Sequence, residues 1–182
     1  MDNKTGAERY HSFAIFLHWL LAIGVFVMIG LGWYMTEIPK GTPDRAFWFN
    51  LHKSIGVTLG VLVLIRLWWR LTHKPPALPA SMPAWEVTAA KISHTLLYAC
   101  LVIMPVVGFV GSNFTKYGVK YFGIPIGPFF PENQAVRDAL QEVHEITSYV
   151  LIAAIVVHIL AAFKHLVIDK DRVFERMLPG RQ

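Results

Sequence analysis

The chain has 182 residues, enough for one domain, and 54% of them are hydrophobic while only 16% are charged. Because a water-soluble domain carries about 25% charged residues, this composition favours a protein that lies in lipid. The single cysteine excludes a disulfide framework. The net charge of +5 agrees with the Lys/Arg surplus that membrane proteins carry in their cytoplasmic loops, so nucleic-acid binding is not expected.

Four segments are apolar and long enough to cross the roughly 30 Å hydrocarbon core of a bilayer. They span approximately residues 13–35, 51–71, 92–114 and 144–163. No small-residue cleavage site follows the first segment, so we expect a retained span rather than a signal peptide. We therefore predict an all-α, integral membrane four-helix bundle that forms a single domain over residues 1–182.

The connections between these segments differ in kind. Residues 72–83 are rich in proline and are not expected to be helical. The segment 115–141 is longer and contains several Gly and Pro residues. It is predicted to cap one membrane face, with the part from Asn133 onward leading into the fourth helix.

Lys and Arg are distributed unequally between the two sides of the predicted bundle. Eleven lie on the side of both termini and six on the other, so the positive-inside rule predicts cytoplasmic termini. The eleven are Lys4, Arg9, Arg66, Arg70, Lys74, Lys91, Lys164, Lys170, Arg172, Arg176 and Arg181, and the six are Lys40, Arg45, Lys53, Lys116, Lys120 and Arg137.

Two histidines of the fourth segment, His144 and His158, are separated by 14 residues. At 100° per residue this spacing is close to four full turns, so both side chains leave the same face of the helix. The rise per residue separates them by about 21 Å along the helix axis. One helix is therefore predicted to present two imidazoles, each near a different membrane surface.

Each of these imidazoles has a partner at matching depth. His158 and His18 both lie five or six residues inside the same predicted boundary, while His144 and His52 both open their helices at the opposite side. Two depth-matched pairs are the arrangement that two bis-histidine haems require. The sequence thus predicts two b haems, one held by His18 and His158, the other by His52 and His144.

Other interpretations of these residues remain open. A histidine within the membrane can simply hydrogen-bond a neighbouring helix, and a haem-free transporter or metal binder lined by histidines is a rival function. Gly56 and Gly60 make room for a macrocycle or form a helix-packing seam. Arg66 and Arg70 are predicted to pair with haem propionates, or they reach the headgroups at the membrane interface.

Short motifs recur in order along the chain, and at these residues it resembles the bacterial cytochrome b561 family over essentially its whole length. The segments that carry the resemblance are 16–20 (FLHWL), 52–56 (HKSIG), 92–94 (ISH), 105–108 (PVVG), 143–145 (VHE), 157–165 (VHILAAFKH) and 168–171 (IDKD). Its axial ligands map onto His18, His52, His144 and His158, the four residues that spacing selects.

The resemblance implies a di-haem protein of the bacterial inner membrane that exchanges electrons with quinone, either ubiquinone or menaquinone. Some members of the family oxidise superoxide and reduce ubiquinone, so superoxide or another small one-electron donor is a candidate here. If the chain is an enzyme, we expect a quinone-linked oxidoreductase. A membrane cytochrome subunit of a larger complex uses the same ligands and stays an alternative function. A homodimer is an open alternative for the oligomeric state. His94 is expected either to relay protons to quinone or to serve helix packing.

Overall fold

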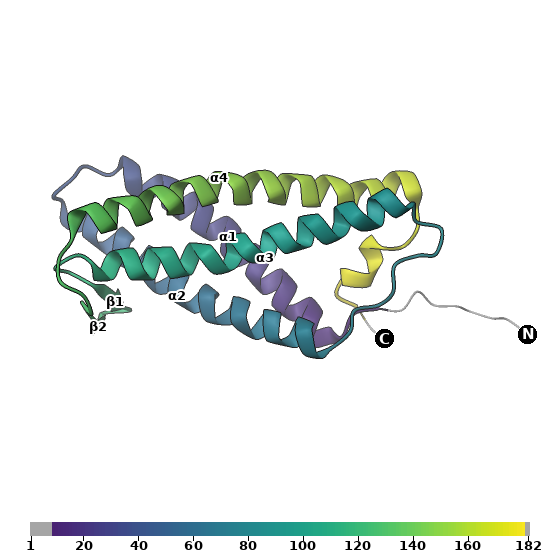
Figure 1. Ribbon diagram of the computed structural model, residues 1–182, viewed down its shortest axis with the longest axis horizontal. Coiled ribbons are helices and arrows are strands. Elements are labelled where there is room, and N and C mark those ends of the chain that lie inside the picture. The colour runs from purple at the N-terminus through teal and green to yellow at the C-terminus, as the bar shows by residue number, and fades with distance from the viewer. Residues whose placement is uncertain (1–8, 181–182) are drawn as a thin grey trace, which may run out of the picture.

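The computed structural model describes residues 9–180, and within them four long helices run side by side (Figure 1). They are α1 (Ser12–Glu37), α2 (Pro43–Thr72), α3 (Ala84–Asn113) and α4 (Gln134–Lys164). All four are long and apolar enough to cross a membrane. The prediction of a membrane four-helix bundle is confirmed. We call the end with the start of α1 and the end of α4 the terminal end.

Three helices begin earlier than their hydrophobic segments predict. Helices α2, α3 and α4 start eight to ten residues before the predicted spans, so the expectation that His52 and His144 open their helices is wrong. Polar caps mark the starts of α2 and α4: Thr42 Oγ1 accepts from the Arg45 amide at 3.3 Å, and Asn133 Oδ1 accepts from the Val136 amide at 3.1 Å. Helix α3 instead follows Pro83 and has no side-chain cap bond. Hydropathy locates only the lipid-embedded part of a helix, because a helix begins at its cap.

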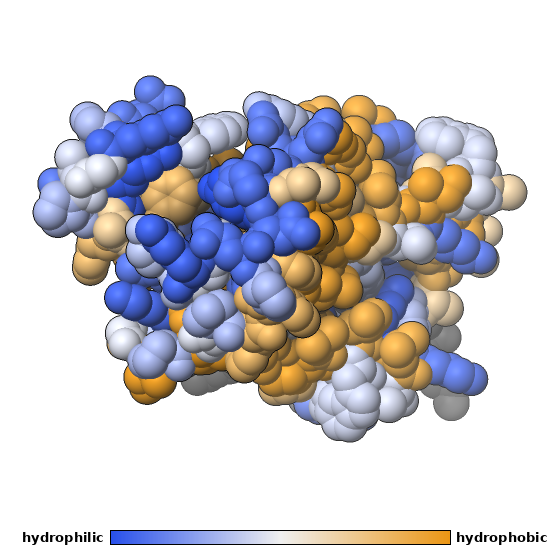
Figure 2. Space-filling model, turned by 60° about the vertical axis from the view of Figure 1, so that its left-hand side comes forward, coloured by the Kyte–Doolittle hydropathy of each residue, from blue (hydrophilic) through white to orange (hydrophobic). Residues whose placement is uncertain are grey.

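Large hydrophobic side chains cover the outside of the bundle. Ile23 and Leu160, from α1 and α4, are each 63% exposed, and similar residues line the outer faces of α2 and α3. Figure 2 shows hydrophobic residues over a broad area of one face, with hydrophilic residues gathered on the end that comes forward. Such an apolar patch is far larger than a soluble monomer exposes, so lipid must cover it.

Close backbone packing follows the order of the helices along the chain. Helix α1 packs on α2, α2 on α3, and α3 on α4, whereas in the described residues α4 has at most isolated close backbone approaches to α1 or α2. At the α2–α3 contact, a Cβ added to Gly60 would lie 2.9 Å from Pro105 Cβ. Gly60 therefore serves as a packing seam, one of its two predicted roles.

A β-hairpin lies at the end of the bundle opposite the terminal end, which we call the hairpin end (Figure 1). Strands β1 (Val119–Tyr121) and β2 (Ile124–Ile126) pair antiparallel, with Lys120 opposite Pro125. The buried Ser54 of α2 anchors them: its Oγ lies 3.0 Å from the Lys120 carbonyl oxygen and accepts from the Phe122 amide at 2.9 Å. The segment caps one end, as predicted, but the hairpin itself was not foreseen.

At the terminal end the chain folds back beneath the bundle after α4. A π-helical turn, η1 (His165–Asp169), follows α4 directly, and a 3₁₀ turn, η2 (Phe174–Met177), comes after residues 170–173. The Trp19 indole N–H donates to the Met177 carbonyl at 2.7 Å, and the Tyr10 amide donates to the Arg176 carbonyl at 3.3 Å. These bonds attach the tail to the start of α1, next to His18.

The Gly60–Pro105 contact generates a stability prediction. Replacing Gly60 with Ala should lower the free energy of unfolding by about 1–3 kcal/mol, because the rigid proline ring cannot move aside. Gly30 of α1 has no atom within 4 Å of an added Cβ, so Gly30→Ala should be neutral or stabilising, as helix propensity alone dictates. Thermal loss of helical circular dichroism in detergent compares the two variants, and equal stability would contradict close packing at Gly60.

Candidate functional site: two histidine pairs

The first histidine pair lies between α1 and α4 near the terminal end. The ring centroids of His18 and His158 are 6.3 Å apart, with their planes inclined by 64°. Both side chains are half-buried. The two residues are 140 positions apart in the sequence, and the fold places their rings opposite each other in an edge-to-face arrangement.

The second pair lies between α2 and α4 towards the hairpin end. The ring centroids of His52 and His144 are also 6.3 Å apart, and their planes are inclined by 68°. The Nδ1 of His144 lies 3.2 Å from the Met104 carbonyl oxygen, and the ring packs against Gly108, where an added Cβ would come within 3.4 Å. A proton on that Nδ1 would leave Nε2 free as a ligand, the usual arrangement for a metal-bound histidine.

The spacing within each pair fits a single metal ion between the two imidazoles. A metal–nitrogen bond of about 2 Å on each side places the two ring centroids about 6 Å apart. The buried Nδ1 of His52 has no hydrogen-bond partner among the described residues, although buried polar atoms are normally paired. Two stacked imidazoles or a direct hydrogen bond would bring the rings closer, so the residues fit a bis-histidine haem.

Backbone packing around the two pairs agrees with this fit. Each pair joins α4 to a helix with which it makes little close backbone contact, α1 in one case and α2 in the other. Helix α4 instead packs closely on α3. The helix that supports α4 is therefore not one of the two helices, α1 and α2, that supply the facing histidines. A flat macrocycle needs space between the two helices that supply its ligands. The wide separation of α4 from α1 and α2 is consistent with that space.

Two arginines predicted at the site occupy different positions. Arg66 lies at the terminal-end pair: its guanidinium donates to the Ala14 carbonyl at 2.7 Å and lies 3.4 Å from His18 Nδ1. Arg70, one turn further along α2, is directed to the Tyr10 hydroxyl at 3.5 Å. Arg66 is thus in direct reach of a ligand on His18, whereas Arg70 lies nearer the surface of the terminal end.

His94 of α3 also lies beside the terminal-end pair. Its ring centroid is 5.5 Å from that of His158, in an edge-to-face arrangement. Among the described residues, the terminal-end pair therefore has a third imidazole in ring contact with it. His94 thus borders the terminal-end pair, and its contact with His158 is also part of the packing of α3 on α4.

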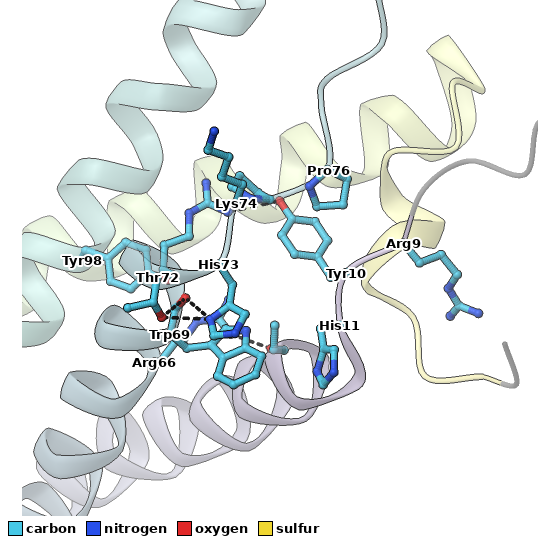
Figure 3. A pocket seen from close by; sticks show the side chains of 13 residues that line it. Arg9, Tyr10, His11, Arg66, Trp69, Thr72, His73, Lys74, Pro76 and Tyr98 are labelled. Atoms are coloured by element: carbon cyan, nitrogen blue, oxygen red, sulfur yellow. Dashed lines mark hydrogen bonds between the residues drawn. The ribbon is translucent and has the colours of Figure 1, made fainter.

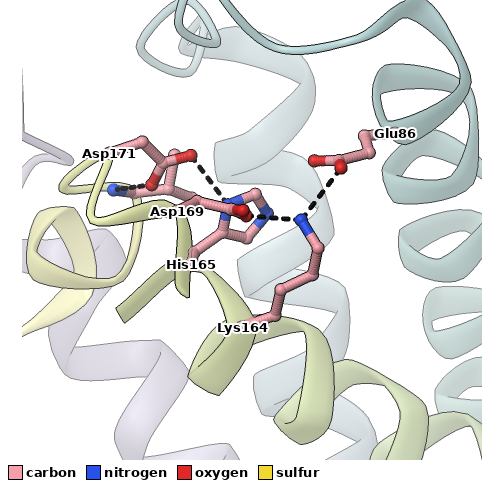
Figure 4. Close-up of polar contacts among 6 residues, drawn as sticks. Glu86, Lys164, His165, Asp169 and Asp171 are labelled. Carbon is pink, nitrogen blue, oxygen red and sulfur yellow. Dashed lines mark hydrogen bonds and ion pairs between the residues drawn. The ribbon is translucent and has the colours of Figure 1, made fainter. Parts of the chain in front are cut away.

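Sequence reasoning missed a polar cluster at the end of α4 (Figure 4). His165 Nδ1 lies 2.7 Å from an Asp171 carboxylate oxygen and 3.2 Å from one of Asp169. Lys164 bridges Asp169, at 2.5 Å, and Glu86 of α3, at 2.9 Å. The His-x-x-x-Asp-x-Asp spacing of residues 165–171, after the last predicted span, is the sequence signal that could have indicated this cluster.

A four-helix membrane protein with two imidazole pairs at different depths has the features of a membrane cytochrome of the b type. Sequence comparison agrees. The model of the prokaryotic cytochrome b561 family matches residues 9–180, so the chain belongs to that family. It is similar to two proteins of Escherichia coli (strain K12), cytochrome b561 homolog 1 and cytochrome b561 homolog 2.

The two relatives cover nearly the whole chain. Homolog 1 is 27% identical over 182 residues, covering 96% of this chain and 99% of the relative. Homolog 2 is 31% identical over 175 residues, covering 94% and 92%. The chain is accordingly a multi-pass protein of the bacterial inner membrane that binds b-type haem and serves transmembrane electron transfer, in contact with lipid and redox partners.

Proposed function

We propose that the protein binds two b haems, one between His18 and His158 and the other between His52 and His144. The observation that carries this proposal is the equal centroid spacing of 6.3 Å in two pairs that share α4. The 14-residue separation on α4 makes the sites about 21 Å apart along the helix axis, one towards each end of the bundle. When bound, the haems supply one-electron transfer between the two membrane surfaces.

The protein residues determine what such a site can do. Two imidazoles on each metal leave no coordination position for a substrate, so exchange with other molecules has to take place at the periphery of each site. The backbone carbonyl of Met104 orients His144, and an oriented imidazole is a stronger ligand. At the terminal-end site, Arg66 and Arg70 are proposed to hold the propionate carboxylates by charge-assisted hydrogen bonds.

We further propose that the terminal end faces the cytoplasm and exchanges electrons with membrane quinone, ubiquinone or menaquinone. The Lys/Arg surplus at this end supports the orientation. Quinone reduction consumes two protons as well as two electrons, so a quinone site needs groups that donate protons. At the hairpin end the partner is a small one-electron donor, with superoxide as a candidate.

The polar cluster at the end of α4 is the best source of these protons. His165 follows His158 by seven residues, close to two full turns, so it lies on the same side of α4 and about 10 Å nearer the surface. Asp169 and Asp171 contact its ring and link it to the exposed segment beyond α4. We propose that His165, oriented by these carboxylates, delivers protons to quinone and that His94 lines the approach to His158.

The pairing generates a test in which each site serves as the control for the other. Replacing His18 or His158 with Ala should remove the terminal-end haem and leave the other, while His52→Ala or His144→Ala should do the reverse. The purified variants should bind half the haem of the unaltered protein and lose one of two components in a redox titration followed by absorption. Loss of the same component from the His18 and His52 variants would contradict the pairing, and a colourless unaltered protein would contradict haem binding.

The proton path has a separate test. Because general acid catalysis is worth at least about 10²-fold, His165→Ala should slow quinone reduction by about that factor. Its haem spectrum should be unchanged, since His165 is not a proposed ligand. Lys170→Gln, which removes the positive charge of an exposed residue between Asp169 and Asp171, is the matched control. Stopped-flow oxidation of the pre-reduced protein by a soluble quinone measures both, and an unchanged rate for His165→Ala would exclude this residue from the path.

A further inference from the structure

The two histidine pairs differ in what lies beside the ring nitrogens of their members. At the terminal end, a guanidinium nitrogen of Arg66 lies 3.4 Å from His18 Nδ1. At the hairpin-end pair, the Met104 carbonyl oxygen lies 3.2 Å from His144 Nδ1. A guanidinium has only donors and a permanent positive charge, whereas a carbonyl oxygen only accepts. One pair therefore has a cation beside it, and the other has a hydrogen-bond acceptor.

The half-buried Arg66 forms no ion pair with a carboxylate of the described residues. Its guanidinium donates to the Ala14 carbonyl at 2.7 Å, and its neighbour on α3 is the uncharged Tyr98. Both Arg66 and Tyr98 line a cavity of about 940 Å³ at the terminal end (Figure 3), and the described residues that line it include no Asp or Glu. Hydrogen bonds to neutral groups hold a guanidinium in place but leave its charge unchanged. Arg66 therefore keeps a positive potential at His18.

The hairpin-end pair has a different electrostatic environment. Lys53 follows His52 in the sequence, but successive residues of a helix do not face each other. The Lys53 ammonium donates to the Gly118 carbonyl at 3.2 Å, so it is directed to the segment before β1. The other member of the pair, His144, has the partial negative charge of the Met104 carbonyl oxygen beside its Nδ1. The protein thus places less positive charge at this pair than at the terminal-end pair.

We infer that Arg66 sets the reduction potential of the terminal-end haem above that of the hairpin-end haem, an inference that rests on the haem pairing proposed above. Reduction adds one electron to a site, so a nearby cation stabilises the reduced form. A carbonyl that accepts from the Nδ1–H of a ligand makes the imidazole a stronger electron donor, which stabilises the oxidised form. Two b haems carry identical propionates, so the difference between the sites comes from the protein.

The order of the two potentials gives electron transfer a direction. One electron leaves the hairpin-end haem, whose iron passes from ferrous to ferric, and enters the terminal-end haem, whose iron passes from ferric to ferrous. In this step no bond forms or breaks and no proton moves. The transfer is downhill from the proposed one-electron donor towards the proposed quinone. Arg66 acts on it through His18 and touches no substrate, a role additional to holding a propionate.

A redox titration followed by absorption tests the order of the potentials. The haem that remains in the His52→Ala protein is expected at the terminal end, and the haem that remains in the His18→Ala protein at the hairpin end. The first should have the higher potential, by about tenfold in the equilibrium constant for reduction, or about 59 mV for one electron. Equal potentials or the reverse order would overturn the inference. A variant without haem would contradict the pairing on which the inference rests.

Substitution of Arg66 tests the source of the difference. In the holoprotein, Arg66→Gln should lower the potential of the terminal-end haem by about tenfold in the same constant and leave the other haem unchanged. Arg66→Lys keeps the positive charge and should restore most of the potential. Arg172→Gln removes the charge of an exposed arginine beyond α4, at the same end, and is the matched control. Both potentials should be unchanged in it, because solvent screens that charge.

The outcomes of the Arg66 substitutions separate its two roles. Both haems bound with an unchanged potential in Arg66→Gln would overturn the inference, as would an equal shift in Arg172→Gln. If Arg66→Gln loses the terminal-end haem, Arg66 is needed to hold it, and the order of the potentials in the two single-haem proteins decides the question.

Discussion

Helix α4 presents two imidazoles on one face, and each must be satisfied inside a bilayer. An unpaired polar ring in hydrocarbon is costly, so the partners His18 and His52 have to lie at the same depths as His158 and His144. This requirement sets the relative height of α1, α2 and α4. The remaining packing serves it: α3 supports α4 from the other side, and glycines such as Gly60 and Gly108 let neighbouring groups approach without disturbing the two pairs.

The two ends of the bundle are closed by different means. At the hairpin end, backbone groups of β1 and of the β1–β2 turn bond to Ser54, two residues after His52, so the cover is tied directly to the helix that carries the imidazole. At the terminal end the cover is the tail after α4, attached through Trp19 beside His18, and it carries ionisable side chains. In the proposed function, the electron donor would meet a cover that is attached through backbone bonds, and the quinone would meet His165 and its carboxylates.

Hydropathy was sufficient to predict the four spans, because the length of an apolar segment is visible in the sequence. Histidine spacing was sufficient to predict which imidazoles lie together, because it follows from the periodicity of α4. Hydropathy did not predict where α2 and α4 begin, since Thr42 and Asn133 cap these helices outside the hydrophobic segments, although the part from Asn133 onward was expected to lead into the fourth helix. The hairpin was missed because three-residue strands carry little pattern of their own and depend on Ser54 for their attachment. The cluster around His165 joins residues of α3, α4 and η1, and no spacing within one helix reveals Glu86 as its member.

The weak backbone contact of α4 with α1 and α2 has a consequence for biogenesis. The helices pack in chain order, α1 on α2, α2 on α3 and α3 on α4, and in the proposed pairing the haems would join α4 to α1 and α2 by bridging His18 to His158 and His52 to His144. Haem binding would then complete the assembly rather than add to a finished scaffold. Without these two links α4 would be held mainly by α3, so the proposed haems would contribute to the stability of the bundle as well as to electron transfer.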